Sequence, residues 1–245
     1  MARQSRAPTL LLTRPAPQSQ RFAQEVRALH PTVQVVISPL MQTKWLTPVL
    51  PDGPVWALIL TSETGAEAAG QLRLSGHALP DLAYCVGPRT ADAARTAGFQ
   101  PLSAEGDVHA LESLIRAAKA EGPLLHIRGQ DAAGNLAQSL TMGGIVTYSA
   151  ITYAQEPCPL TPAATAVLQG EGPILLPLFS PRSAQIFAQS LPPNTTAPLW
   201  IVAISPAAAL QAQPLNPARL ITAAQPNGGN MLHAVADLLA SAASA

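Results

Sequence analysis

The sequence predicts an α/β protein made of two similar three-layer domains with parallel sheets, one inserted in the other and joined to it by a two-stranded linker. Three observations predict this fold class. Short apolar runs alternate with alanine-rich segments of helical periodicity, which is typical of parallel sheets covered by helices. Several runs end in a small or polar residue followed by proline, as at a helix start. The order of these junctions repeats, and 245 residues suffice for two small domains.

The same pattern gives the positions of the elements in chain order. The apolar runs predict strands at Leu10–Thr13, Val33–Ser38, Val55–Thr61, Leu82–Val86, Leu124–Arg128, Ile145–Tyr153, Ile174–Phe179, Trp200–Ile204 and Ala218–Ala223. Apolar residues three and four positions apart predict helices at Glu63–Leu74, Arg89–Ala97, Leu111–Ala120, Asp131–Leu140, Arg182–Leu191 and Gly229–Leu239. Further helices are expected in most of the remaining gaps.

After four of the strands, one small or polar residue is followed by proline, at Pro15, Pro88, Pro181 and Pro206. Proline suits the first position of a helix, because the N–H that it lacks would have no partner there. Ser62 before Glu63 forms a similar junction, with a serine cap and a carboxylate in the first turn. Such junctions place free N–H groups at the carboxyl edge of a sheet, where open α/β proteins bind ligands.

Equivalent junctions recur at a constant distance, which indicates an internal repeat. The strand that ends at Ser62 matches the strand that ends at Ser180, 118 residues on. Gly87 after the next strand matches Ser205, again 118 residues on. The alternative is that any two strand–helix units look alike.

The strand before Arg128 matches the first strand of the chain, before Arg14, with an offset of 114 residues. The middle of the chain then holds one whole repeat unit, and its two ends share a permuted copy. We therefore expect a discontinuous first domain at 1–40 plus 158–245 and an inserted second domain, with the linker strands, at 41–157.

Charge and hydropathy exclude several kinds of partner. The 14 basic and 14 acidic residues cancel, so neither nucleic acid nor a membrane is expected as a partner. The apolar runs fall short of the ~18 residues that cross a bilayer, and no signal peptide is evident, so we expect a cytoplasmic protein.

Cys85 and Cys158 have no metal or redox spacing, which suits a reducing compartment. The first domain carries a net charge of +4 and the second −4, which suits domains that close on each other.

The sequence contains few groups for covalent or metal chemistry. Its five histidines are scattered without a metal-ligand spacing, so we expect no metal site and no cofactor. His126 lies inside an apolar strand and is expected to be a satisfied core histidine rather than a catalyst. Ser62 and Ser180 lack the flanking glycines of a nucleophile elbow, so helix capping explains them better.

Four arginines share one topological position, at a strand end or in the turn after it: Arg14, Arg89, Arg128 and Arg182. Pairing with a nearby surface carboxylate would explain any one of them alone. Four together favour an anionic ligand, such as a polycarboxylate, in the cleft between the domains.

A series of short motifs marks the strand ends: Leu12-Thr13-Arg14-Pro15, Leu60-Thr61-Ser62, Val86-Gly87-Pro88-Arg89-Thr90-Ala91, Ile127-Arg128-Gly129, Ile151-Thr152-Tyr153, Phe179-Ser180-Pro181 and Ala203-Ile204-Ser205-Pro206. In this order and spacing the chain resembles the uroporphyrinogen-III synthase (HemD-like) family nearly end to end. The resemblance implies the inserted two-domain architecture that the repeat predicts independently.

The resemblance implies a cofactor-free lyase of heme and tetrapyrrole biosynthesis that cyclises hydroxymethylbilane, a linear tetrapyrrole, to uroporphyrinogen III. The substrate loses its terminal hydroxyl as water, a spiro intermediate forms, and ring D is inverted. Because the free bilane closes to the type I isomer, we expect catalysis by positioning rather than by a covalent intermediate. The preceding enzyme, hydroxymethylbilane synthase, is the expected protein partner, and a monomer is the default state.

Carried onto this chain, the resemblance gives Tyr153 the role of assisting departure of the hydroxyl; the alternative is an aromatic residue that packs at the hinge. The residues expected to bind substrate are Thr13, Arg14, Thr61, Ser62, Gly87, Arg89, Thr90, Arg128, Gly129, Ser180, Arg182 and Ser205. Ala207 and Ala208 depart from the threonines that are common in the family, which motivates one alternative, a relative that binds tetrapyrrole without cyclising it. The other alternative is a non-catalytic, cleft-closing binding protein for a polycarboxylate.

Overall fold

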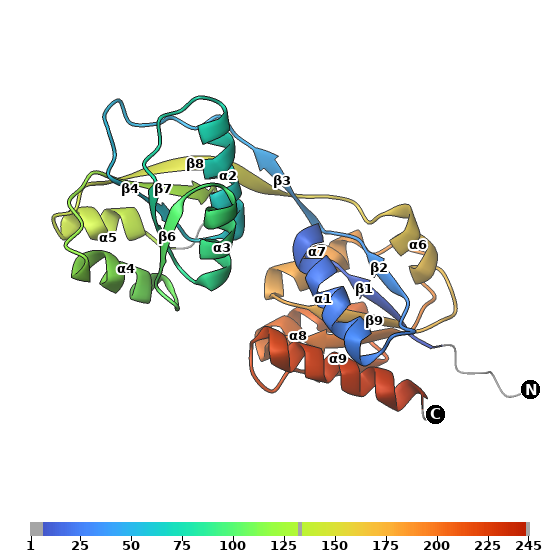
Figure 1. The fold of residues 1–245 in the computed structure, drawn as a ribbon. Coiled ribbons are helices and arrows are strands. Elements are labelled where there is room, and N and C mark those ends of the chain that lie inside the picture. The colour runs from blue at the N-terminus through green and yellow to red at the C-terminus, as the bar shows by residue number, and fades with distance from the viewer. Residues whose placement is uncertain (1–6, 132–133, 244–245) are drawn as a thin grey trace, which may run out of the picture. The chain divides into compact units, whose positions relative to one another are not determined.

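Two compact units make up the computed structural model, which describes residues 7–131 and 134–243 (Figure 1). Unit 1 consists of Met1–Gln42 with Pro157–Ala245, and unit 2 consists of Thr43–Glu156. The chain leaves unit 1 within strand β3 (Met41–Trp45) and returns within strand β8 (Thr147–Pro157). These strands are neighbours in one sheet, so a pair of strands links the units.

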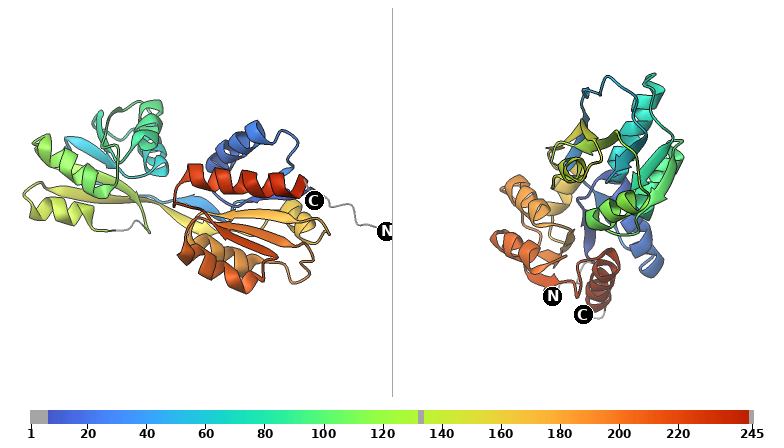
Figure 2. Two further views of the ribbon diagram at one scale, coloured as in Figure 1. Left: turned by 90° about the horizontal axis from the view of Figure 1, so that it is seen from below. Right: turned by 90° about the vertical axis from the view of Figure 1, so that its left-hand side faces the viewer.

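Unit 1 contains a parallel sheet of five strands in the order β11-β10-β9-β1-β2. They are β1 (Thr9–Leu12), β2 (Val35–Ile37), β9 (Ile174–Leu178), β10 (Leu199–Ala203) and β11 (Arg219–Thr222). Helices α1 (Ala16–Leu29) and α9 (Gly228–Ala243) cover one face (Figure 2, left). The other face is covered by α6 (Pro162–Leu168), α7 (Pro181–Ser190), α8 (Pro206–Ala212) and the 3-10 turn η1 (Gln213–Leu215). Because helices cover both faces, β9 and β10 are buried along their whole length.

Unit 2 contains a sheet of six strands in the order β3-β8-β7-β4-β5-β6. Besides β3 and β8, the strands are β4 (Ala57–Leu60), β5 (Leu82–Cys85), β6 (Gln100–Ser103) and β7 (Leu124–Gly129). Helices α2 (Glu63–Leu74) and α3 (Pro88–Thr96) cover one face, and α4 (Val108–Ala117) and α5 (Leu136–Met142) cover the other (Figure 1). The Leu46 N–H donates to the Thr152 carbonyl and the Cys158 N–H to the Leu40 carbonyl, so β3 runs antiparallel to β8.

The two sheets share one topology, which confirms the predicted repeat. Strands β8-β7-β4-β5-β6 of unit 2 take the places of β2-β1-β9-β10-β11 of unit 1. Strands β4 and β9, which lead to Ser62 and Ser180, are thus equivalent and central in their sheets. The same holds for β7, which contains Arg128, and β1, which leads to Arg14. The expected fold class is confirmed: two similar parallel-sheet, three-layer domains, one of them interrupted by the other.

Three helix starts at the carboxyl ends of strands, those of α2, α7 and α8, have serine caps, whereas α1 and α3 have no side-chain cap and Pro15 is the N-cap of α1 rather than its first residue. Ser62 Oγ accepts the Gly65 N–H, and Ser180 Oγ accepts the Ser183 N–H in a reciprocal capping box. Pro88, Pro181 and Pro206 occupy early positions of α3, α7 and α8. These caps fix the helix starts beside the strand ends from which the candidate residues project.

The structure differs from the expected elements at three places. Strand β6 was not expected from the sequence, and β3 lies where a linker strand was expected but is absent from the strands predicted from apolar runs. Helix α5 begins at Leu136 rather than at Asp131, because Gly134 takes a left-handed conformation (φ 79°) that a helix does not allow. Residues 132 and 133 of that expected helix lie outside the described residues. Among the described residues, no helix combines the length and apolar character that a membrane span requires.

A β-bulge interrupts the pairing of β7 with β8. Arg128 pairs with Ile151, but the next residue, Gly129, pairs with Tyr153, so Thr152 is the extra residue. Tyr153 packs in the cluster beneath α2 and α3, and Thr152 lines a pocket beside α2. Two consecutive side chains therefore face the same layer, as bulges permit.

Candidate active site

The candidate residues lie at the carboxyl ends of the two sheets, one set in each unit. Unit 2 carries Thr61, Ser62, Gly87, Arg89, Thr90, Arg128, Gly129 and Tyr153, and unit 1 carries Thr13, Arg14, Ser180, Arg182 and Ser205. Strands β5, β4, β7 and β8 are successive neighbours, so the strand ends in unit 2 lie side by side. The carboxyl end of a parallel sheet is where open α/β proteins bind ligands.

A direct side-chain contact joins Tyr153 of β8 to Ser62, the N-cap of α2. The Tyr153 hydroxyl lies 2.8 Å from Ser62 Oγ, which also accepts the Gly65 N–H at 2.9 Å. Tyr153 is only 8% exposed, so its ring is packed while its hydroxyl reaches the sheet edge. When Ser62 donates its proton to the phenol oxygen, the phenolic proton is left for a ligand.

Gly129 stands against the ring of Tyr153. A Cβ atom at this position would lie 2.6 Å from Tyr153 Cε2 and 2.8 Å from its Cζ. Real side chains do not approach so closely, and the tyrosine ring has rigid geometry. Gly129 is therefore required here so that the ring can lie against the backbone of β7.

His126 of β7 is a buried, hydrogen-bonded histidine, as its apolar strand predicts. It is 5% exposed, and its Nε2 lies 3.2 Å from Thr61 Oγ1. Burial, with a smaller contribution from the charge of Arg128, lowers the pKa of His126 to about 4. The imidazole is thus neutral at neutral pH, and it ties the end of β4 to β7.

The four arginines lie at strand ends or helix starts in different surroundings. The Arg128 Nε donates to the Gly129 carbonyl, and its Nη2 donates to the Gln130 carbonyl. The Arg14 guanidinium lies 4.3 Å from the centre of the Phe179 ring. Arg89 and Arg182 are exposed in the first turns of α3 and α7.

Two of the predicted threonines have buried side chains. Thr13 is 4% exposed and Thr90 is 5% exposed as whole residues, so little of either residue reaches the surface. Ala207 and Ala208, the alanines at positions where threonine is common in the family that the chain resembles, differ in exposure. Ala208 is fully buried, with its N–H 3.3 Å from Ser205 Oγ, whereas Ala207 is exposed.

Sequence reasoning missed one residue beside the site, Trp45. Its ring lies edge-on to Tyr153, with 6.3 Å between ring centres and an angle of 71°. It was missed because the first linker strand was expected without residue bounds, so its side chains were not assigned to a face. The signal is weak: Met41, Thr43 and Trp45 alternate with the strongly polar Gln42 and Lys44, in a segment that pairs with the C-terminal part of β8.

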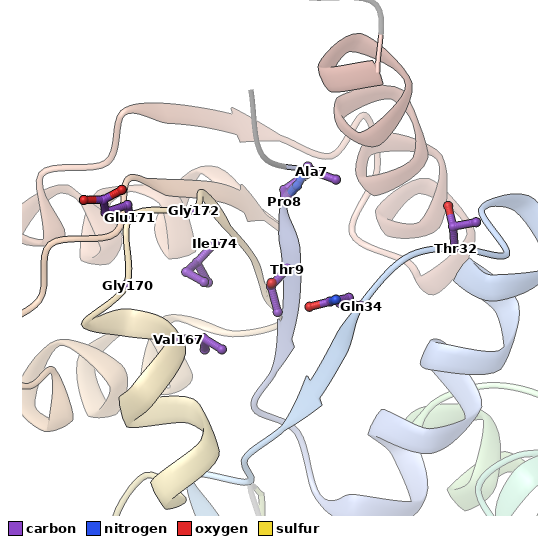
Figure 3. Close-up of a pocket in the computed structure, with 10 residues that line it drawn as sticks. All are labelled: Ala7, Pro8, Thr9, Thr32, Gln34, Val167, Gly170, Glu171, Gly172 and Ile174. Atoms are coloured by element: carbon purple, nitrogen blue, oxygen red, sulfur yellow. The ribbon is translucent and has the colours of Figure 1, made fainter. Parts of the chain in front are cut away.

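A pocket of about 410 Å³ in unit 1 lies away from the candidate residues (Figure 3). Thr9 begins β1, Ile174 begins β9 and Gln34 precedes β2, so this pocket is at the amino end of the sheet. None of the predicted site residues lines it. Among the described residues, no group of three or more His, Cys, Asp or Glu side chains is arranged to hold a metal ion.

Comparisons with known proteins identify the family and the fold. The family model of HemD uroporphyrinogen-III synthase (HEM4) matches residues 20–233. The fold is similar to that of uroporphyrinogen-III synthetase from Helicobacter pylori 26695, with a TM-score of 0.61 and 18% identity over 94% of this chain and 99% of that one. A uroporphyrinogen III synthase from the extremely thermophilic bacterium Thermus thermophilus matches with a TM-score of 0.42 and 14% identity over 96% and 98% of the two chains. The comparison with curated protein sequences gave no match. Because the family model spans most of its length, the chain belongs to the HemD uroporphyrinogen-III synthase family.

Proposed function

We propose that the carboxyl ends of the two sheets bind the carboxylates of hydroxymethylbilane and that Tyr153 assists its dehydration. The reaction itself follows from the family: the chain cyclises hydroxymethylbilane to uroporphyrinogen III with loss of water and inversion of ring D. The observation that carries the proposal is the Tyr153–Ser62 pair, a phenol bonded to a helix N-cap at a sheet edge.

Carboxylate binding is supported by the helix starts and the arginines at these edges. In α3, Pro88 has no N–H, and the N–H groups of Arg89 and Thr90 have no carbonyl partner within the helix, because they lie in its first turn. The helix dipole favours an anion at this end, and the exposed Arg89 guanidinium adds a full positive charge. A substrate with many carboxylates suits several such positions at once.

Dehydration is the step that Tyr153 is proposed to assist. The phenol donates a hydrogen bond to the terminal hydroxyl of the bilane while Ser62 donates to the phenol oxygen. The C–O bond breaks, the hydroxyl takes up one proton and leaves as water, and a protonated azafulvene remains. The pyrrole carbon that forms the last bond then loses its hydrogen as a proton, and the pyrrole becomes aromatic again. The net change is the loss of one water.

Ring inversion requires that the azafulvene meets the substituted carbon of ring D rather than the free one. Unaided closure gives the type I isomer, so the enzyme must hold the chain in a geometry that favours the spiro route. Fixing a reacting geometry in this way accounts for large rate effects without a covalent intermediate. Carboxylate anchors spaced along two sheet edges are suited to that task.

The test of the Tyr153 role is Tyr153→Phe, which removes the hydroxyl and keeps the ring. The rate of type III formation, measured by oxidising the product and separating uroporphyrin isomers against a no-enzyme control, is expected to fall by about 100-fold. The matched control is Tyr148→Phe, because Tyr148 lies in the same strand and is 44% exposed. Tyr153→Phe at the wild-type rate contradicts the proposal, whereas type I product alone from the wild type would mean a protein without cyclase activity.

The carboxylate anchors are tested with Arg89→Gln. Its expected effect is a KM for hydroxymethylbilane raised several-fold with kcat less affected, because a substrate anchor is lost. Arg95→Gln is the control, since Arg95 lies in the last turn of the same helix and pairs with Asp92. Equal KM values for the two variants would argue against an anchor at the start of α3.

We propose in addition that the chain works as a cytoplasmic monomer that receives its substrate from hydroxymethylbilane synthase. The closure of the free bilane to the type I isomer supports transfer between the two enzymes, and the monomer is the default state. Sedimentation of the purified protein tests the monomeric state.

In an assay that contains both this protein and hydroxymethylbilane synthase, direct transfer of the bilane predicts less type I product than free diffusion of the bilane does.

A further inference from the structure

We infer that Trp45 is a positioning residue for the reaction: its indole holds the Tyr153 phenol against Ser62. The inference rests on the proposed role of Tyr153. It concerns a residue that lies outside the motifs at the strand ends and is contributed by the linker strand β3.

The Tyr153 ring is confined on two sides. On one side is Gly129, where even a single added carbon would lie 2.6 Å from the ring. The indole of Trp45 makes the second contact, edge-on, with 6.3 Å between ring centres. Such an aromatic pair restricts the orientation of both rings beyond the effect of simple burial.

The backbone of Trp45 is held in place independently of its side chain. The N–H of the next residue, Leu46, donates to the Thr152 carbonyl, directly before Tyr153. On the other side, Lys44 forms an ion pair of 2.8 Å with Glu156 across the same two strands. The register of β3 on β8 therefore places the indole beside Tyr153, and truncation of the Trp45 side chain leaves that register intact.

Within the described part of the chain, Trp45 is the one aromatic residue whose ring pairs with that of Tyr153. Trp45 borders a pocket of about 240 Å³ that Leu46, Leu72 and Thr152 also line. Removing the indole would enlarge this pocket and take away the aromatic contact of the Tyr153 ring. Trp45 is itself 42% exposed, so its truncation removes an orienting contact more than it removes core.

The experiment is a double-mutant cycle in the type III assay with Trp45→Ala, Tyr153→Phe and the double variant. Trp45→Ala is expected to lower kcat by about five- to tenfold with little change in KM, since an aromatic contact of ordinary strength is lost. Trp45→Phe is expected to retain most of the activity, because an aromatic edge remains. In the Tyr153→Phe background, Trp45→Ala is expected to cause no further loss of kcat, because the hydroxyl that it positions is already absent.

The control for loss of an exposed tryptophan is Trp56→Ala, which is expected to keep the wild-type kcat. Trp56 belongs to the same unit, is 61% exposed and makes no ring pair within the described part of the chain. A wild-type kcat for Trp45→Ala, or the same fold-loss in both backgrounds, overturns the inference. Tyr153→Phe at the wild-type kcat overturns the proposed role of Tyr153 as well, so the two failures are distinguishable.

Discussion

His126 is expected to make the stability of unit 2 depend on pH. Burial first, and the charge of Arg128 second, lower its pKa from 6.5 to about 4 in the folded protein. The unfolded chain binds a proton on this ring near pH 6.5, so between the two values the unfolded state holds one proton more. The stabilisation is therefore complete above pH 6.5 and is lost as the pH falls toward 4.

The size of the effect follows from the difference between the two pKa values. About 2.5 pKa units at 1.36 kcal/mol per unit give roughly 3 kcal/mol. The side chain is only 5% exposed, so solvent screens little of this. The perturbation is His126→Gln, which does not titrate and keeps a hydrogen-bonding end for Thr61 Oγ1, 3.2 Å from the imidazole.

The assay is urea unfolding of both proteins at pH 7.5 and pH 4.5. Carboxylates titrate in both, so the difference between the two proteins isolates the histidine. On going to pH 4.5, the wild type is expected to lose about 2 to 3 kcal/mol more of its free energy of unfolding than the variant. An equal loss, or an NMR titration of His126 with a midpoint near 6.5, would refute the reasoning.

Three further predictions concern packing and caps. Gly129→Ala would place a carbon against the Tyr153 ring, so kcat for type III formation is expected to fall at least about tenfold and the free energy of unfolding by about 1–3 kcal/mol from overpacking. The control is Gly53→Ala, where nothing lies within 4 Å of the added carbon, and it should leave kcat and the free energy of unfolding unchanged. Phe187→Ala opens a cavity in the fully buried core of unit 1, and urea unfolding should show a loss of about 3–5 kcal/mol; a loss below about 1 kcal/mol would contradict that packing. Ser180→Ala removes the capping box of α7, so thermal unfolding should report a loss of about 1 kcal/mol, and an unchanged midpoint would count against the cap.

The fold class was predictable because the central strands carry its signal in continuous apolar runs. Ile174–Leu178 and Leu199–Ala203 are buried on both faces, and a parallel sheet under two helix layers needs such runs. Strands β3 and β6 are absent from the strands predicted from apolar runs because they lie at the two edges of their sheet. Their sequences, MQTKW and QPLS, carry polar residues and a proline, which edge positions tolerate and apolar-run reasoning overlooks.

The candidate residues were predictable one at a time, but their contacts were not. Ser62 is recognisable as a cap from its local sequence, whereas its bond to Tyr153 spans 91 positions and depends on strand order. His126 was predicted correctly as a core residue, since an apolar strand surrounds it. Trp45 was missed because only the pairing of two linker strands brings it to the tyrosine.

The bulge in β8 has a consequence for locating this tyrosine in other sequences. Because Thr152 is an extra residue, Tyr153 lies opposite Gly129 although strict alternation from Ala150 would turn it to the other face. A chain with one residue fewer before the tyrosine would reach the same partner through a regular strand. Deletion of this single residue thus preserves the tyrosine–glycine pair, and an alignment gap at this point marks a change of strand length and not the loss of the residue.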